Sequence, residues 1–246
     1  MKHWLFVFAF STSLLAQSAI PAGTILPVRL NSSLNSKKVR AGQVVTARVM
    51  QTVPLSASKL PAGTKVVGHV VSVSPATPTR GAEISFVFDS VMRSRDEATR
   101  ISTNLRALAS MMEVEEAQVP ISGPDRGTSQ NAWTTTQVGC DVVYRGGGPV
   151  VSGSQVVGVP AANGVLVRVR SGPGTKCRSE VSENDRPQAL WIFSSGACGT
   201  YGFSDLAIVH AGRTDPLGLI TLASTKGDLN VPSGSGMLLR VNRGEQ

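Results

Sequence analysis

Short runs of apolar and β-branched residues alternate with polar positions from Ile20 to Val91, and glycine or proline separates one run from the next. A period of two places successive side chains on opposite faces of an extended strand, so this pattern indicates strands joined by tight turns. It predicts four strands, at Ile25–Leu30, Val44–Val53, Lys65–Ser74 and Glu83–Met92. The first part of the chain is therefore expected to form hairpins and meanders.

The same phrase precedes two of these strands. Pro21-Ala-Gly-Thr24 leads into the first strand, and Pro61-Ala-Gly-Thr64 leads into the third. Proline presets the approach to a turn, and glycine supplies the positive φ that the turn needs. The repeat indicates either a duplicated strand-opening element or the same turn chemistry used twice, because such a turn before a strand is common.

The segment Ile101–Gln118 fits two patterns. Its apolar residues at helical spacing are Ile101, Leu105, Leu108 and Met112. Its first half could equally continue the sheet, so we predict a strand that runs into a short helix near Ser110–Gln118. The glutamates of that helix could serve as an acid and a base, but without other titratable residues nearby they are expected to form a solvated face.

The character of the chain changes after this segment. Residues 120–129 are rich in Gly, Pro, Ser and Asp and are expected to form a loop or linker, and the glycine-dense stretch 139–164 an irregular insertion. Further strands are predicted at Val165–Val169, Ala189–Phe193, Leu206–Val209, Leu217–Ala223 and Met237–Val241.

Composition supports an all-β fold. Aromatic residues make up 5% of the chain and charged residues 16%, a balance that favours strands and turns over a helical bundle. We expect a barrel-like or sandwich arrangement of short antiparallel strands with at most one short helix. Residues 20–119 would form its first part, the glycine-rich, cysteine-containing residues 120–212 an insertion or second β subdomain, and residues 213–246 the strands that complete the barrel.

Residues 1–19 have the three parts of a secretory signal peptide. Lys2 and His3 give a basic start, Trp4–Phe10 an apolar run, and Leu14–Ala19 an exit that ends in small residues. The apolar run is shorter than the roughly 20 residues of a membrane-spanning helix, which favours cleavage over an uncleaved anchor. The mature chain is expected in the periplasm, at the outer membrane or outside the cell.

The three cysteines, Cys140, Cys177 and Cys198, all follow this leader. Disulfides persist in exported proteins, and three cysteines allow one pair and one free thiol. We predict a bond between Cys177 and Cys198, because a hairpin-like return could bring them together, and a free Cys140. No second Cys or His stands at ligand spacing beside any of them, so no metal site is expected.

The formal net charge is +8, from 24 Lys and Arg against 16 Asp and Glu. In an envelope this suits anionic lipid, lipopolysaccharide, cell-wall polymer or an acidic partner protein, although it could simply keep the protein soluble. Nucleic acid is not expected, because the basic residues are scattered instead of gathered on one helix or interleaved with stacking aromatics.

The sequence predicts no catalytic, cofactor-binding or metal-binding residue. His69 lies inside an alternating strand and is expected to be a surface or lightly packed residue. His210 has Ser204, Asp205 and Asp215 close in sequence, which leaves an envelope hydrolase as an alternative. The Gly-x-Ser-x-Gly turn between a strand and a helix that would support it is absent.

Aromatic and arginine residues of the second half could line a carbohydrate or peptide groove. The candidate ligand surface consists of Tyr144, Arg145, Trp191 and Tyr201. The alternative is that Trp191 and Phe193 are core residues of one strand.

Four phrases follow one another in a characteristic order: Pro21–Leu30, the strand Val44–Val53, Leu60–Gly68 and Leu229–Arg243. This order resembles the TrbI-like β-barrel module of the outer-channel scaffold proteins in type IV secretion and conjugation systems. The resemblance implies a barrel and, as one expectation, a subunit of a channel assembly that could form homo-oligomers. The stretch Gly127–Gly212 has no counterpart in that module, which favours a stand-alone envelope protein. We therefore expect an exported, non-enzymatic envelope protein with a structural or binding role and no cofactor.

Overall fold

The computed structural model describes residues 20–55, 58–94, 97–117, 133–137, 141–145, 150–152, 155–161, 164–167, 191–193, 197–209 and 218–242. The chain is all-β, as predicted. Among the described residues it contains one helix, α1 (Met111–Glu116), at the position where the sequence predicts a short helix.

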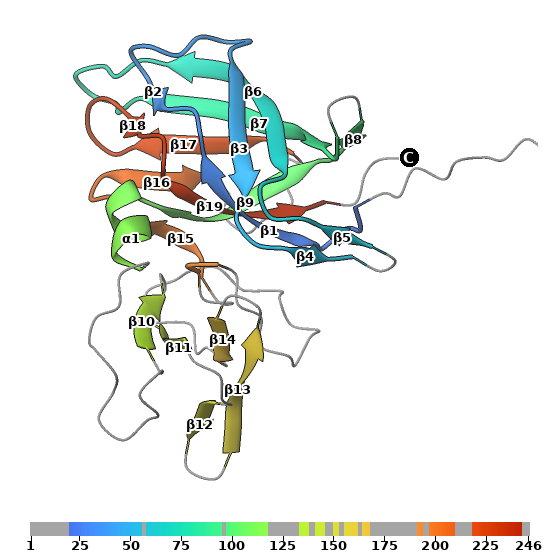
Figure 1. The fold of residues 1–246 in the computed structure, drawn as a ribbon. Helices are drawn as coiled ribbons and strands as arrows, with labels where there is room; N and C mark the ends of the chain where they lie inside the picture. The colour runs from blue at the N-terminus through green and yellow to red at the C-terminus, as the bar shows by residue number, and fades with distance from the viewer. Residues whose placement is uncertain are drawn as a thin grey trace, which may run out of the picture.

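One large, mostly antiparallel sheet dominates the fold (Figure 1). Its strands are β1 (Ile25–Leu30), β3 (Val44–Val49), β6 (Lys65–Ser74), β7 (Glu83–Met92), β8 (Ala98–Arg100), β9 (Thr103–Ala109), β15 (Gly199–Tyr201), β16 (Leu206–Val209), β17 (Ile220–Ser224) and β19 (Gly236–Val241). They follow the order β15-β9-β19-β1-β3-β6-β7-β17-β16, with β8 paired to β7. Only the pairing of β15 with β9 is parallel among the strand pairs of this sheet.

The expected pairing of the first half with the C-terminal strand is present. In register, Ile25 of β1 lies opposite Arg240 of β19, and Arg29 lies opposite Gly236. The other edge of β19 pairs with β9. The C-terminal strand is therefore an interior strand of the sheet, between two segments that are far apart in the sequence.

Of the barrel-like and sandwich arrangements expected from the sequence, the sheet has the sandwich-like one, and the expectation that residues 213–246 complete a barrel is wrong. Its order has two ends, β15 and β16, and these two strands form no ladder with each other. A side-chain bond, from Thr200 Oγ1 to the carbonyl oxygen of Leu206 at 2.9 Å, joins them instead. β15 has only three residues, and Gly202 at a φ of 69° turns the chain away directly after it. The two end strands β15 and β16 therefore do not pair with each other, and the sheet stays open.

The two Pro-Ala-Gly-Thr phrases fold in the same way. Gly23 and Gly63 have φ values of 84° and 85°, as the third residue of a type II turn requires. The hydroxyl groups of Thr24 and Thr64 each donate to the carbonyl oxygen of the turn's proline at 2.6 Å. Each glycine N–H donates to the neighbouring strand, Gly23 to Val241 and Gly63 to Val49. Each turn thus fixes the register of the strand that it opens.

The main core is enclosed by the large sheet. It contains fully buried leucines, isoleucines, valines and phenylalanines from β1, β3, β6, β7, β9, β17 and β19. Phe86 and Phe88 of β7 make an edge-to-face contact within it, with ring centroids 5.7 Å apart. The alternation seen in the sequence is thus the alternation between this core and the opposite face of the sheet.

Smaller pairs and hairpins complete the described structure. They are β2 (Leu34–Asn35) with β18 (Asn230–Val231), β4 (Val53–Pro54) with β5 (Lys59–Leu60), β10 (Trp133–Gln137) with β11 (Asp141–Arg145), and β12 (Val150–Ser152) with β13 (Gln155–Ala161) and β14 (Gly164–Val167). The stretch 139–164, predicted to be irregular, therefore contains strands. The predicted loop 120–129 lies outside the described residues.

Two predicted strands need correction. The strand predicted over Val44–Val53 ends at Val49. The N–H of Met50 still donates to the carbonyl oxygen of Pro27 on β1, but Pro27 has no N–H with which to return the bond, and Val53 starts the separate pair β4–β5. The strand predicted over Ala189–Phe193 is absent from its described part, residues 191–193. Trp191 has a φ of 59°, and such a left-handed residue cannot be part of an extended strand.

Candidate functional site

A second, smaller core lies on the face of the sheet that points away from the main core. Along β9, Leu105 and Leu108 belong to the main core, whereas Ala107 and Ala109 face the other way. The members of this second core are Ala107, Ala109, Val114, Ala117, Ile192, Phe193, Ala197 and Leu238. They come from β9, β19, α1 and the segment that leads to β15, so the second core joins elements on both sides of residues 118–190.

Small residues of the sheet let α1 and the segment around Ile192 approach closely. A Cβ atom on Gly236 of β19 would lie 3.1 Å from Val114 Cγ2 and 3.2 Å from Ile192 Cδ1. The helix itself begins at Ser110, whose hydroxyl accepts a bond from the N–H of Glu113 at 3.3 Å. The N–H of Ser110 in turn donates to the carbonyl oxygen of Tyr201, which ties α1 to β15.

Trp191 and Tyr201, two members of the predicted ligand surface, both pack against this second core and are half-buried. The ring of Trp191 meets Phe193 edge to face, with centroids 6.3 Å apart. Its backbone N–H donates to the side-chain oxygen Oε1 of Gln51. The phenol oxygen of Tyr201 accepts a bond from the N–H of Cys198 at 2.9 Å. The structure therefore brings these two aromatic residues to one region, which we call the outer-face cluster.

The other two members of the predicted surface lie on β11. Tyr144 and Arg145 pair with Thr134 and Trp133 of β10. Their side chains lie outside the described part of the structure. A shared surface of all four residues stays a prediction.

Arg106 of β9 lies beside the outer-face cluster, and only 3% of it is exposed. The two terminal nitrogens of its guanidinium group have no hydrogen-bond partner among the described residues. Burial, and secondly the positive charge of Arg240, lower the pKa of Arg106 to about 10, whereas Tyr201 acts in the opposite direction. Desolvation disfavours the charged form, but a group with this pKa is still charged at pH 7.

Arg106 is not among the site residues predicted from the sequence. Its one available signal is a lone charged residue in the run Leu105-Arg-Ala-Leu-Ala109. Strict alternation would group Arg106 with Leu108. An irregularity between Leu238 and Leu239, where Leu105 and Ala107 are the paired residues and Arg106 is extra, breaks that alternation.

His69 is a surface residue on β6, as predicted, with 47% of its side chain exposed. Its Nδ1 atom lies 3.0 Å from Oδ2 of Asp89, and the hydroxyl of Ser90 donates to the other oxygen of that carboxylate at 2.8 Å. In a catalytic triad the histidine stands between the hydroxyl and the acid. Here the acid stands between them, so the arrangement is not that of a catalytic triad.

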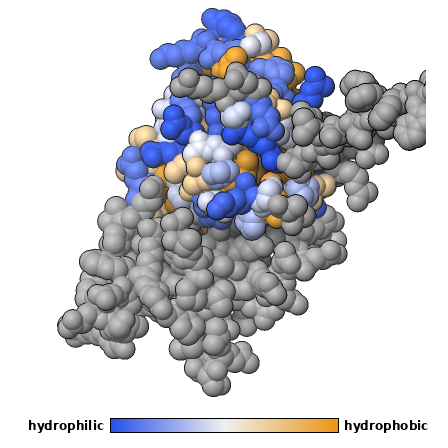
Figure 2. Space-filling model, turned by 45° about the vertical axis from the view of Figure 1, so that its right-hand side comes forward, coloured by the Kyte–Doolittle hydropathy of each residue, from blue (hydrophilic) through white to orange (hydrophobic). Residues whose placement is uncertain are grey.

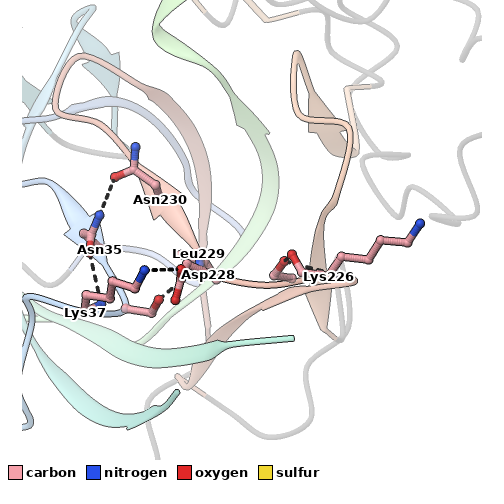
Figure 3. A network of polar contacts seen from close by, with 8 residues as sticks. Asn35, Lys37, Lys226, Asp228, Leu229 and Asn230 are labelled. Atoms are coloured by element: carbon pink, nitrogen blue, oxygen red, sulfur yellow. Dashed lines mark hydrogen bonds and ion pairs between the residues drawn. The ribbon is translucent and has the colours of Figure 1, made fainter. Parts of the chain in front are cut away.

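A polar network connects the region around β2 with the region around β18 (Figure 3). Nζ of Lys37 lies 2.6 Å from Oδ2 of Asp228, and the side chain of Asn35 donates to Oδ1 of Asn230. Lys226 points away from the other charged groups in this view. The ion pair is exposed and contributes little to stability. The network links segments that are 195 positions apart in the sequence at Asn35 and Asn230.

No known protein family, curated protein or solved structure matches this chain. The resemblance to the TrbI-like module therefore stays a prediction from the sequence alone.

The other predicted site residues are only partly visible. Cys198 is buried, whereas Cys140, Cys177 and His210 lie outside the described residues, so the disulfide and the hydrolase alternative stay predictions. No group of three or more His, Cys, Asp or Glu side chains that could hold a metal ion is found in the described part of the chain. In the same part, no helix is long and apolar enough to span a membrane.

The outer-face cluster contains groups of the kinds that bind ligands in proteins. It offers two aromatic rings that pack against the second core, with the buried cation Arg106 near Tyr201. Aromatic rings supply large contact areas to sugars or apolar groups, and guanidinium groups bind carboxylates and phosphates. On the face shown in Figure 2, the surface of the described residues is mostly polar with scattered apolar patches.

Proposed function

We propose that this chain is an exported, non-enzymatic protein of the cell envelope that uses its sheet as a scaffold and its outer-face cluster to bind an anionic cell-wall polymer. The observation that carries the proposal is Trp191, a bulky residue at a φ of 59°. Such a backbone conformation costs about 1–3 kcal/mol and is retained where the surrounding structure demands it, most often at binding sites.

Three contacts support Trp191 in this conformation. Its ring packs on Phe193, its N–H bonds to Gln51, and its side chain rests on the second core. An aromatic ring held in place loses little conformational entropy when a ligand binds, which makes it an effective anchor. The net charge of +8 would then attract an acidic polymer over a longer range.

The export part of the proposal is supported by the leader at residues 1–19 and by the three cysteines that follow it. In cells that express the full chain, we expect the protein in the envelope or culture-fluid fraction. Its N-terminus should lie near Gln17 or Ile20, and unreduced peptide mapping should show Cys177 linked to Cys198. Val7→Asp places a charge in the apolar run and should leave the precursor in the cytosol, because the run must be apolar to direct export.

Ser18→Thr, a conservative change in the same leader, is the matched control and should be exported normally. A native protein that is found in the cytosol with its leader intact would contradict the proposal. A chain that is exported but sediments as a large ring would favour the channel-subunit alternative.

The binding part is tested by sedimentation of the purified mature protein with insoluble peptidoglycan. We expect binding that weakens with added salt, because charge contributes to it. Trp191→Ala should weaken binding by about tenfold, since truncation of an aromatic anchor commonly costs that much. Phe203→Ala is the matched control, because Phe203 is a half-buried aromatic residue that packs against the main core.

Equal binding by the wild type and Trp191→Ala would refute the role of the outer-face cluster. Hydrolysis of the polymer that is lost in His210→Ala would show instead that the chain is an envelope hydrolase.

A further inference from the structure

Arg106 is a buried cation that no described group neutralises. Its exposure is 3%, and both terminal guanidinium nitrogens lack a hydrogen-bond partner among the described residues. Buried charges in proteins are almost always paired or hydrogen-bonded, because desolvation of an unpaired charge is very unfavourable. An arginine with this burial and without a partner therefore needs a compensating group.

The local geometry explains how Arg106 reaches this place. In the ladder between β9 and β19, Leu239 pairs with Leu105 and Leu238 pairs with Ala107, which leaves Arg106 as the extra residue of a bulge. A bulge redirects a side chain from the strict alternation of a strand and often occurs beside functional sites. The strand thus keeps Leu105 and Leu108 in the main core while it places an arginine beside the second core.

A second cation lies close to the first. Arg240 of β19 is two residues from Leu238, a member of the second core, so both point to the outer face of the sheet. The repulsion between the two cations is strong enough to contribute to the low pKa of Arg106. An anion bound between Arg106 and Arg240 would attract both cations and so offset the repulsion between them.

We propose that Arg106 is the centre of an oxyanion-binding site, at which its two terminal nitrogens bind the carboxylate or phosphate group of a ligand. The planar fork of a guanidinium group matches the two oxygens of either anion. Tyr201 lies near this position, and Trp191 packs against the same second core, so both offer contact area to the remainder of the ligand. This site goes beyond the proposed function and depends neither on the compartment nor on polymer binding.

The test is thermal unfolding and calorimetric titration of the purified mature chain with inorganic phosphate and, separately, succinate. Sodium chloride at the same ionic strength is the reference. At about 100 times Kd, the effective oxyanion should raise the Tm of the wild type by about 5 °C. The oxyanion that produces the shift identifies the ligand group as a phosphate or a carboxylate.

Arg106→Met removes the charge but keeps an unbranched apolar stem, and it should abolish the shift. Arg48→Met is the matched control, because Arg48 is an exposed arginine on β3 and its loss changes the net charge equally. It should retain the full shift. Arg106→Lys keeps the charge without the fork and should bind about tenfold more weakly, since lysine cannot form the bidentate contact.

The absence of a Tm shift and of binding heat with both anions in the wild type would overturn the proposal. An equal shift in Arg106→Met would do the same, because it would place the anion elsewhere. Circular dichroism checks that Arg106→Met is folded. If it is not, the comparison of Arg106→Lys with the wild type decides, and equal Kd values in these two proteins would refute the site.

Discussion

Replacement of Phe86 by alanine is expected to lower the free energy of unfolding by about 4 kcal/mol, because truncation of a buried phenylalanine removes apolar contact and leaves a cavity. Phe86 lies on β7, is fully buried, and packs edge to face on Phe88. Its backbone pairs with Val70 on one side and with Ile220 on the other. Thermal unfolding followed by circular dichroism should show a fall in Tm of about 10 °C.

Val44→Ala is the matched control for this prediction. Val44 lies on β3 of the same sheet, but 58% of it is exposed. Its truncation should change the free energy of unfolding by no more than about 0.5 kcal/mol. A loss below about 1 kcal/mol in Phe86→Ala would contradict the packing of the main core, since a rigid core does not close such a cavity.

The strands of the main core could be predicted because two signals agree in them. The bounds of β1, β6 and β7 coincide with the prediction, and so do those of β16. Each of the first three has a buried face and a more exposed one, which produces the alternation, and tight turns delimit them. Where the local pattern and the tertiary contacts favour the same structure, the bounds of a strand can be predicted from the sequence.

A third turn separates the two explanations that the sequence left open for the repeated phrase. The segment Arg40-Ala-Gly-Gln43 lacks both the proline and the threonine, yet Gly42 has a φ of 82° and its N–H bonds to Val70. The N–H of Gln43 closes the turn on Arg40. Glycine at the third position is therefore sufficient for this turn, and the likeness of the other two does not require duplication.

The parts that could not be predicted depend on contacts between distant segments. Trp191 lies in an apolar run that suggests a strand, but its backbone N–H bonds to the side chain of Gln51, 140 positions away. The parallel pairing of β15 with β9 joins Gly199 to Ala107, two segments that are far apart in the sequence. Neither interaction leaves a local signal.

The candidate site could likewise be predicted only in part. Trp191 and Tyr201 could be selected by residue type, because aromatic residues are scarce in this chain and common at binding sites. Arg106 could not, because its burial follows from a bulge, and a bulge shifts the assignment of faces by one residue. Strict alternation therefore assigns Arg106 to the face of the main core, whereas the structure places it on the outer face of the sheet.

Gly68→Ala is expected to destabilise the protein by about 3 kcal/mol, because overpacking against a fixed backbone cannot relax by a change of rotamer. Gly68 lies in the middle of β6 opposite Phe88, next to a bulge at which Asp89 is the extra residue. A Cβ atom on Gly68 would lie 1.7 Å from the carbonyl oxygen of Val87 and 2.8 Å from the Cα atom of Phe88. To remove this overlap, β6 and β7 must separate at the centre of the sheet.

Thermal unfolding should show a fall in Tm of about 10 °C for Gly68→Ala. Val71→Ala is the matched control on the same strand, because Val71 is exposed and its truncation should cost no more than about 0.5 kcal/mol. Separation of the two strands should also lengthen the contact between His69 and Asp89, which spans the same bulge. A Gly68→Ala protein as stable as the control would show that β6 and β7 do not approach each other this closely, and the register on either side of the bulge would then be wrong.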